Sequence, residues 1–415
     1  MNKKFTKSVV SNEDLVPIFS LGELYVSDFL DAGQKPKFEK SKLELGFDPV
    51  SKLVQLTEQP SKEAMWGSFY WYLSATNPQM QLALKDVTEK TINCIPSKEN
   101  SVYLDIASND GTLLSFVPNS LKKVGIDPSK YDIVDKFDNI CDYFSADVFL
   151  KNGYSKARYI SCCAMFYDLD NPNQFLKDIY NILEDDGIFV LQMSYTPLMI
   201  LQMELGNICQ EHLCYYNLTS LKYLFDRNGF NIKDVELNNV NGGSIRVYLQ
   251  KDTAPNNFKS PSDKDISFIR LQSLLQWEEN NGYNDIQVYL DFFNKINELK
   301  EKTINFIKEE KQKGKTIFGY GASTKASTVY QYFGLDSNLI TKIAEKQERK
   351  WGKYTIGTNV PICSDEEMRA SKPDYLLVGP WFFLESFKKR ESEFLKNGGA
   401  FILTSPEFTI YKNEG

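Results

Sequence analysis

A single decapeptide, Asp105–Leu114, constrains the fold of this chain more than any other stretch. The apolar run 101–105 predicts a buried strand, and residues 112–116 predict the start of a helix. A turn of small residues between a strand and a helix, with an acid at the strand end, is typical of nucleoside binding. Small residues let the backbone approach the ligand, and the helix N-terminus is electropositive. A second apolar strand ends in Asp127, at a spacing that suits a carboxylate bound to ribose hydroxyls.

The turn contains only one glycine, Gly111, whereas a dinucleotide-binding turn needs about three because the pyrophosphate lies against the backbone. Asp105 and Asn109 instead offer an acid and an amide, which suit a cofactor with a cationic amino-acid tail and no phosphate. S-adenosylmethionine fits this description, with its ribose on Asp127 and its adenine near Asp147. Another nucleotide-binding α/β enzyme remains the alternative.

Strands and helices alternate through the middle of the chain, which predicts the α/β fold class with a mostly parallel sheet covered on both faces. The expected strands are 102–105, 124–127, 157–163 and 187–194. Ligands bind such sheets beyond the carboxyl ends of the strands. Asp105, Asp127 and the segment 164–167 fall at this edge, so we expect Met165 and the turn residue Ala107 to contact the cofactor as well.

At 415 residues the chain is too long for one hydrophobic core, so we expect several domains. The pattern predicts a small N-terminal domain over 1–85, a cofactor-binding domain over 86–255, a linker with helices over 256–300, and a second Rossmann-like α/β domain over 301–415. The last of these begins with another strand, glycine turn and helix around residues 316–333.

Composition excludes several classes of protein. The net charge is −7 and no dense basic stripe occurs, which argues against a nucleic-acid partner. No run of 18 apolar residues occurs, which argues against a membrane span and favours the cytoplasm. The 7 cysteines include no Cys-x-x-Cys pair and there is 1 histidine, so we expect free thiols and no zinc or other metal.

The single histidine, His212, follows Glu211 and precedes a Tyr-Tyr pair near the expected ligand edge. A lone histidine is more often structural than catalytic, but one near its ordinary pKa is a suitable general base at neutral pH. Transfer of a methyl group to carbon needs such a base, because the carbon beside a ketone must lose a proton before it attacks. Glu211 would orient the imidazole or a substrate hydroxyl.

An aromatic stretch, Trp66–Tyr72, ends the N-terminal part of the chain. Its rings have two interpretations: they pack against the next domain, or Tyr70 and Tyr72 line a substrate cleft. Both interpretations can hold for different rings.

Four motifs in order resemble the sugar C-methyltransferases: Asp105–Leu114, Ile208–Asn217, Asn241–Val247 and Gly319–Lys325. The likeness covers nearly the whole chain, including the aromatic segment Tyr70–Ser74. These enzymes methylate carbon 3 of nucleotide-linked 4-keto-deoxyhexoses with S-adenosylmethionine. The resemblance implies a small N-terminal domain, a central cofactor domain and a C-terminal Rossmann-like domain that helps hold the nucleotide sugar.

The resemblance also implies roles for individual residues. His212 would be the base, with Glu211 beside it and Tyr72 at the substrate. Tyr70, Tyr215, Asn241 and Lys325 would contact the substrate, with Lys325 either at the diphosphate or in solvent.

The chain departs from the family pattern at several positions. It has no cysteine before Cys94, although the family usually carries zinc in its N-terminal domain. Ala107 replaces a glycine of the cofactor turn, and Gln210 replaces the first histidine of a His-Glu-His motif. The segment Pro380–Phe383 and the pair Ala326-Ser327 also differ.

These departures leave alternatives open. Methylation of a sugar hydroxyl or another small acceptor is one, and a non-catalytic homologue that binds a nucleotide sugar or a protein partner is another. A nicotinamide-dependent oxidoreductase is disfavoured by the single glycine. The pattern does not decide between a monomer and a dimer.

Overall fold

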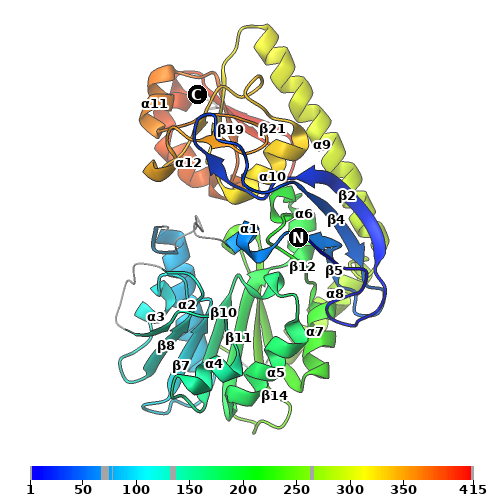
Figure 1. Cartoon of the computed structure of the whole chain (residues 1–415), viewed down its shortest axis with the longest axis vertical. Coiled ribbons are helices and arrows are strands. Elements are labelled where there is room, and N and C mark those ends of the chain that lie inside the picture. Colours follow the sequence, from blue (N-terminus) through cyan, green and yellow to red (C-terminus); the bar gives the residue numbers. More distant parts are fainter. Residues whose placement is uncertain (1, 67–73, 77, 131–136, 262–265, 413–415) are drawn as a thin grey trace.

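The computed structural model describes residues 2–66, 74–76, 78–130, 137–261 and 266–412. Figure 1 shows two α/β units, one below the other, with a small N-terminal sheet along one side. The N-terminal elements are β1 (Lys3–Lys4), β2 (Val16–Leu24), β3 (Phe29–Leu30), β4 (Ser41–Phe47), β5 (Val54–Leu56), β6 (Glu58–Gln59), α1 (Lys62–Trp66) and the 3₁₀ turn η1 (Ser74–Thr76).

The N-terminal sheet is antiparallel, in the order β12-β5-β4-β2. Leu43, Leu45 and Phe47 of β4 are buried, while Lys42 is exposed and Glu44 is half-buried. This period-2 pattern is that of a strand with one face on a core. Pro17 lies in β2, at the edge of the sheet, where a missing N–H breaks no interior ladder.

The central unit contains a seven-stranded sheet in the order β13-β14-β11-β10-β7-β8-β9. The five strands from β11 to β9 are parallel, and β14 and β13 are antiparallel, which confirms the predicted fold class. Its elements are α2 (Pro78–Asn93), β7 (Val102–Ile106), α3 (Thr112–Ser115), β8 (Lys122–Ile126), β9 (Asp138–Ile140), α4 (Ala146–Lys151), β10 (Ala157–Cys163), η2 (Phe166–Asp168), α5 (Pro172–Ile182), β11 (Leu183–Ser194), α6 (Thr196–Leu201), η3 (Leu205–Asn207), β12 (Cys214–Tyr215), α7 (Leu218–Arg227), β13 (Phe230–Asn238), η4 (Val240–Gly242) and β14 (Ser244–Lys251).

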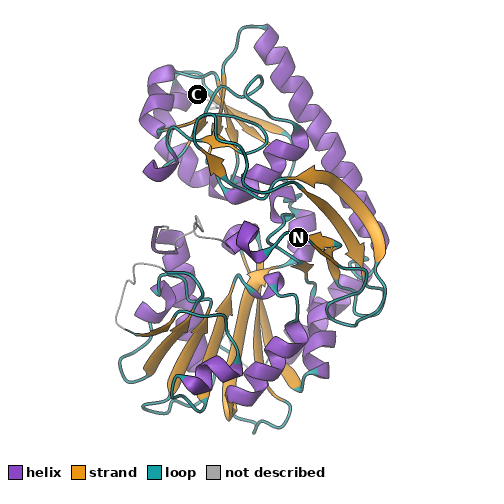
Figure 2. Ribbon diagram, in the orientation of Figure 1, coloured by secondary structure: helices purple, strands orange, loops and turns teal. Residues whose placement is uncertain are grey.

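Helices cover both faces of this sheet (Figure 2). Tyr103 packs in one hydrophobic cluster with Leu84 of α2 and Leu113 of α3. Leu104, the next residue of β7, packs in another cluster with Leu176 of α5. Successive side chains of a strand point to opposite faces, so the apolar run of β7 reflects burial on both sides.

Two helices, α8 (Ser267–Asn280) and α9 (Ile286–Gln312), lead to the C-terminal sheet. That sheet has the order β18-β16-β15-β19-β20-β21 and is parallel except for β21. Its elements are β15 (Ile317–Tyr320), α10 (Thr324–Phe333), β16 (Ile343–Ala344), η5 (Glu348–Lys350), β17 (Tyr354–Thr355), β18 (Ile362–Cys363), α11 (Asp365–Ser371), β19 (Tyr375–Val378), η6 (Trp381–Phe383), α12 (Leu384–Arg390), α13 (Ser392–Lys396), β20 (Ala400–Leu403) and β21 (Thr409–Lys412).

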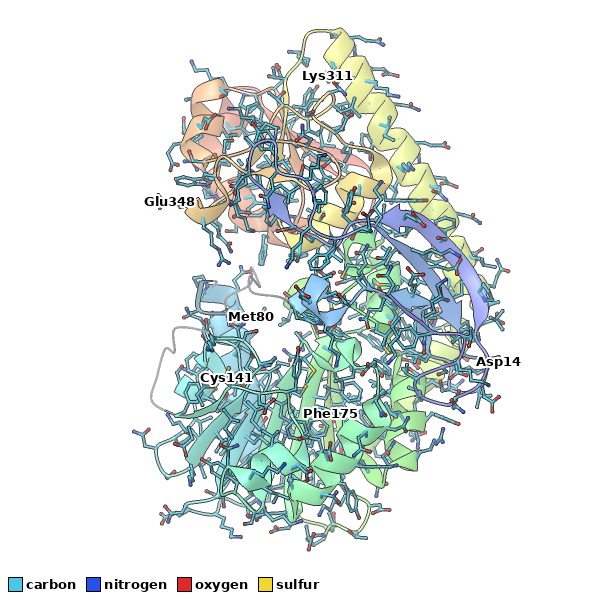
Figure 3. The ribbon with its side chains drawn as sticks, viewed as in Figure 1. Asp14, Met80, Cys141, Phe175, Lys311 and Glu348 are labelled. Carbon is cyan, nitrogen blue, oxygen red and sulfur yellow. The ribbon has the colours of Figure 1, made fainter. Side chains whose placement is uncertain are left out.

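Two expected domain boundaries fall inside helices. The boundary at residue 85 lies within α2, which packs on the central sheet, and the boundary at 300 lies within α9. Met80 and Glu348 lie on the facing sides of the two α/β units in Figure 3. In the described parts of the chain, no helix combines the length and the apolar character needed to cross a membrane.

Candidate active site

The predicted cofactor turn connects β7 to α3 and is hydrogen-bonded to the carboxyl end of β8. The amide of Ala107 donates to the carbonyl of Ile126 at 2.8 Å, and the amide of Asn109 donates to the Asp127 carboxylate at 3.0 Å. Ala107, Asn109 and Gly111 all have left-handed φ angles, of 59°, 50° and 81°. This region costs a residue with a Cβ roughly 1–2 kcal/mol, so the turn is strained where Ala107 stands.

Position 111 favours glycine for two reasons: its φ angle is left-handed, and there is no room for a side chain. A Cβ on Gly111 would lie 2.1 Å from the ring of Phe137, and a Cβ on Gly125 would lie 2.6 Å from the Ser108 hydroxyl. The two glycines thus let β7, β8 and the Phe137 ring approach closely beside the turn.

Asp105 and Asp127 are both buried at this edge. The hydroxyl of Ser161 donates to Asp105 at 2.6 Å. Burial, with a smaller contribution from the negative charge of Asp127, raises the pKa of Asp105 to about 7. Burial also raises the pKa of Asp127, against the opposing bonds from the amides of Ser129 and Asn109.

These residues fit the amino-acid and ribose parts of S-adenosylmethionine. The buried Ser108 hydroxyl has no hydrogen-bond partner among the described residues, so the turn offers an unused polar atom. A cationic ligand would relieve the cost of ionising the buried Asp105. Asp127 retains acceptor capacity for ribose hydroxyls, because a carboxylate offers about four lone-pair sites.

The two other expected cofactor contacts lie further along the sheet edge. Met165 is half-buried directly after β10, the strand that pairs with β7. Asp147 is exposed in the first turn of α4. Tyr70 and Tyr72 lie outside the described residues. Directly after them in the sequence, the amides of Ser74 and Ala75 donate to the side chains of Asn109 and Asp110, at 3.1 and 2.9 Å.

His212 lies in a small pocket at the edge of the central unit. The pocket is lined by Tyr167, Ser194, Thr196, Met199, Asn207, His212, Cys214 and Tyr215. Nδ1 of His212 lies 2.9 Å from the Asn207 carbonyl oxygen, and the ring centroid lies 4.3 Å from that of Tyr167. A carbonyl oxygen only accepts, so Nδ1 carries the hydrogen and Nε2 carries the lone pair.

The expected ordinary pKa of His212 is wrong. Its pKa is lowered to about 3, mainly by burial and also by the positive charge of Lys325, while the hydrogen bond with the Asn207 carbonyl opposes both. The imidazole is therefore neutral throughout the physiological range and available as a proton acceptor.

The N-terminal sheet holds the segment that carries His212. Strand β12 pairs with β5, and the amide of Leu56 donates to the Leu213 carbonyl at 2.8 Å. The side chain of Gln59 donates to the carbonyls of Gln210 and Glu211, at 3.3 and 3.5 Å. Gln210 in turn donates to the Leu24 carbonyl at 3.0 Å. Sequence reasoning missed Gln59, since a lone glutamine carries no pattern that reveals its partners.

Glu211 is buried, and burial raises the pKa of its carboxyl. Tyr215 lines the His212 pocket, and its hydroxyl accepts from the amide of Cys209 at 3.3 Å. Within the described ranges, no group of three or more His, Cys, Asp or Glu side chains is arranged to hold a metal ion.

Lys325 and Asn241 come together where the two α/β units meet. The Lys325 ammonium donates to the Asn241 carbonyl at 3.0 Å and lies 5.5 Å from the centroid of the Phe382 ring. The buried Glu204 carboxylate accepts from the Trp381 indole and partly neutralises Lys325. A second pocket is lined by these side chains and by the end of β19. Asn241 contacts the Lys325 ammonium through its backbone carbonyl and not through its side chain.

Comparisons with known proteins agree with this organisation. Residues 77–235 match the family model of a methyltransferase domain, and residues 239–406 match that of a C-methyltransferase C-terminal domain. C-methyltransferase NovU from Streptomyces niveus is 25% identical over 371 residues, which are 87% of this chain and 86% of the relative.

Solved structures resemble the chain over a smaller part. The plantazolicin methyltransferase BpumL in complex with SAH is 14% identical with a TM-score of 0.33, over 41% of this chain and 83% of its own. An S-adenosylmethionine-dependent methyltransferase from Clostridium acetobutylicum is 14% identical with a TM-score of 0.32, over 43% and 93%. The two consecutive family matches, together with the fold and the acidic turn, identify the chain as an S-adenosylmethionine-dependent C-methyltransferase.

Proposed function

We propose that this enzyme methylates a carbon next to the ketone of a nucleotide-linked keto-deoxy sugar, and that His212 is the general base. One observation carries the proposal: the Asn207 carbonyl accepts from Nδ1–H of His212, so Nε2 carries the lone pair, and His212 lines a pocket. The 25% identity with a C-methyltransferase over 87% of the chain supports a carbon acceptor.

The cofactor residues hold the methyl donor at the edge of the central sheet. Asp105 would bind the amino-acid tail of the cofactor, and Asp127 would bind its ribose. The turn of Ala107, Asn109 and Gly111 would lie against the cofactor. Asp147 and Met165 would lie beside its adenine. When bound, S-adenosylmethionine supplies an electrophilic methyl group.

The acceptor carbon becomes nucleophilic by loss of a proton to Nε2 of His212. The electron pair of the broken C–H bond enters the bond to the carbonyl carbon, and the carbonyl oxygen takes the negative charge. A base whose pKa is about 3 in the free protein is weak. The developing enolate raises that pKa in the complex, because an opposite charge nearby favours the imidazolium.

The other proposed site residues surround this reaction. Glu211 lies next to His212 in the sequence, and Tyr215 lines the same pocket. Lys325 would attract the diphosphate of the substrate, and Asn241 holds its ammonium through a carbonyl. Tyr70 and Tyr72 would contact the sugar from the aromatic stretch.

Hydrogen exchange in heavy water tests the proposal without methyl transfer. We expect the enzyme, incubated with a panel of nucleotide-linked keto sugars and no cofactor, to incorporate deuterium beside the ketone, as measured by mass spectrometry. His212→Ala should reduce the exchange rate by at least about 100-fold, the usual contribution of a general base. Calorimetric titration with S-adenosylhomocysteine provides the control for folding, since the cofactor turn does not involve His212.

Two results would contradict the proposal. Methylation of a sugar oxygen by the wild-type enzyme, without exchange at carbon, would favour the hydroxyl acceptor. Tight binding of S-adenosylhomocysteine with no exchange or methylation on any sugar of the panel would favour a different substrate class or a non-catalytic homologue.

A further inference from the structure

One short turn of backbone contributes to both pockets of the candidate site. Glu204 and Gly206 line the Lys325 pocket, whereas Asn207 and His212 line the other pocket. Gly206 and Asn207 are consecutive residues of η3. The position of η3 therefore affects both pockets.

Side chains of the C-terminal unit bind the two residues that precede η3. The Ser405 hydroxyl donates to the Met203 carbonyl at 2.9 Å. The Trp381 indole donates to the Glu204 carboxylate. Met203 has a left-handed φ of 50°, a strained conformation that persists only where the surrounding contacts hold it. The C-terminal unit thus fixes the start of the turn.

A third contact with the C-terminal unit depends on the missing side chain of Gly206. A Cβ on Gly206 would lie 2.8 Å from the carbonyl oxygen of Lys325 and 3.1 Å from its Cβ. Lys325 is in the first turn of α10, so η3 packs directly on the backbone of that helix. A side chain at position 206 would move η3 away from α10.

The next residue, Asn207, connects this contact to the base. Its carbonyl oxygen lies 2.9 Å from Nδ1 of His212. The backbone between them is tightly folded. The amide of Ile208 donates to the Leu205 carbonyl at 2.8 Å, and the amide of His212 donates to the Cys209 carbonyl at 3.2 Å. In water a neutral histidine favours hydrogen on Nε2, and in a protein the hydrogen bond to one ring nitrogen decides the tautomer.

We propose that Gly206 is a positioning residue, through which the C-terminal unit selects the tautomer of His212 that accepts a proton on Nε2. The packing of Gly206 on α10 places the Asn207 carbonyl, and that carbonyl holds the hydrogen on Nδ1. Separation of η3 from α10 would allow His212 to carry its hydrogen on Nε2, where the ring could not act as the base. The role in catalysis rests on the proposed function, whereas the choice of tautomer does not.

The chain has 1 histidine, which makes the tautomer directly measurable. In the untagged enzyme labelled with nitrogen-15 histidine, every imidazole signal comes from His212. A ring nitrogen that bears hydrogen and one that bears a lone pair have well separated nitrogen-15 NMR shifts. At pH 8, where an ordinary histidine is also neutral, we expect the wild-type enzyme to show hydrogen on Nδ1 and the lone pair on Nε2. The measurement needs no substrate.

Gly206→Ala should shift this spectrum toward the Nε2–H form, because the added Cβ separates η3 from α10. Trp381→Phe tests the same link without added volume, should Gly206→Ala fail to fold. It removes the indole that donates to Glu204, and it should shift the spectrum in the same direction. Titration with S-adenosylhomocysteine shows whether the central unit is folded. The wild-type tautomer in every folded variant would overturn the proposal, and so would an Nε2–H form in the wild-type enzyme.

Lys325→Met is the matched control. It removes the ammonium and its positive charge, but it keeps the backbone and the Cβ against which Gly206 packs. We expect the tautomer of His212 to be unchanged. A shift as large as that in Gly206→Ala would mean that the charge selects the tautomer and the packing does not, and it would overturn the proposal.

Deuterium exchange at the sugar carbon distinguishes positioning from loss of substrate binding. If a keto sugar exchanges in the wild-type enzyme, Gly206→Ala should lower kcat for exchange by about 100-fold, as for a reacting group displaced by on the order of 1 Å. Lys325→Met should mainly raise KM, since Lys325 would attract the diphosphate. An unchanged kcat with a raised KM in Gly206→Ala would overturn the positioning role. If no sugar exchanges, the proposed substrate fails, while the NMR spectra still decide whether the C-terminal unit selects the tautomer.

Discussion

Asp105 is an ionisable carboxyl group buried at the candidate cofactor site, where its charged form is disfavoured. It is 3% exposed and lies at the end of β7, and its pKa is raised to about 7. A structural acid in such a place would need a basic partner, yet Asp105 accepts its side-chain hydrogen bond from the neutral hydroxyl of Ser161. The free protein therefore retains an acid that a cationic ligand stabilises in its charged form.

Cofactor affinity should consequently depend on pH. Below pH 7 the binding of a cationic amino-acid tail must displace a proton from Asp105, so the Kd for S-adenosylhomocysteine should rise by up to about tenfold per pH unit. Above pH 7 it should be constant. Calorimetric titration from pH 6 to 8 measures this slope. Asp105→Asn should bind more weakly with no slope, and a slope equal to that of the wild type would contradict the role.

The cofactor turn could be predicted from the sequence, because it depends on residues that are close together in the chain. Gly111, Asp105 and Asp127 are recognisable from small residues and acids at strand ends. The pKa of His212 was not predictable, because it depends on burial and on Lys325, which is distant in the sequence.

Among the elements, the pairing of β12 with β5 has the most direct bearing on catalysis. Strand β12 has only two residues, Cys214–Tyr215, and it completes a sheet whose other strands come from the N-terminal unit. A two-residue strand has no periodicity of its own, so the sequence indicated the flanking helices and not this strand. Its register nevertheless fixes where the preceding His212 lies.

Gln59→Ala should weaken this support. The variant loses the amide that donates to the carbonyls of Gln210 and Glu211. The folded position of this segment should lose about 1 kcal/mol of stabilising free energy. We expect kcat to fall by up to about tenfold while the affinity for S-adenosylhomocysteine is unchanged. Gln34→Ala, at an exposed position of the same unit, is the control. A matching fall in cofactor affinity would instead indicate general unfolding.

Across the whole molecule, the N-terminal unit joins the two α/β units. Strand β3 pairs with β17 of the C-terminal unit, and Gln331 of α10 exchanges two hydrogen bonds with the backbone of Tyr25, at 2.9 and 3.0 Å. The same unit holds β12 of the central unit. Figure 1 shows β2 and β4 alongside the lower part of the long helix α9, which continues along the side of the C-terminal unit. The His212 segment and the helix that carries Lys325 are therefore both held in part by the N-terminal unit.

Phe19 of β2 tests this joining role, because its ring stacks on Phe293 of α9 with centroids 4.5 Å apart and an interplanar angle of 6°. Phe19→Ala removes a buried ring from the contact between the N-terminal sheet and α9, and should lower the free energy of unfolding by about 3–5 kcal/mol. Phe268→Ala, whose side chain is 69% exposed, should change it by less than about 0.5 kcal/mol. Urea unfolding monitored by tryptophan fluorescence and by circular dichroism measures both. If the N-terminal sheet couples the units, the two probes should report one transition at a lower urea concentration in Phe19→Ala, whereas an unchanged midpoint would show that this contact does not hold the units together.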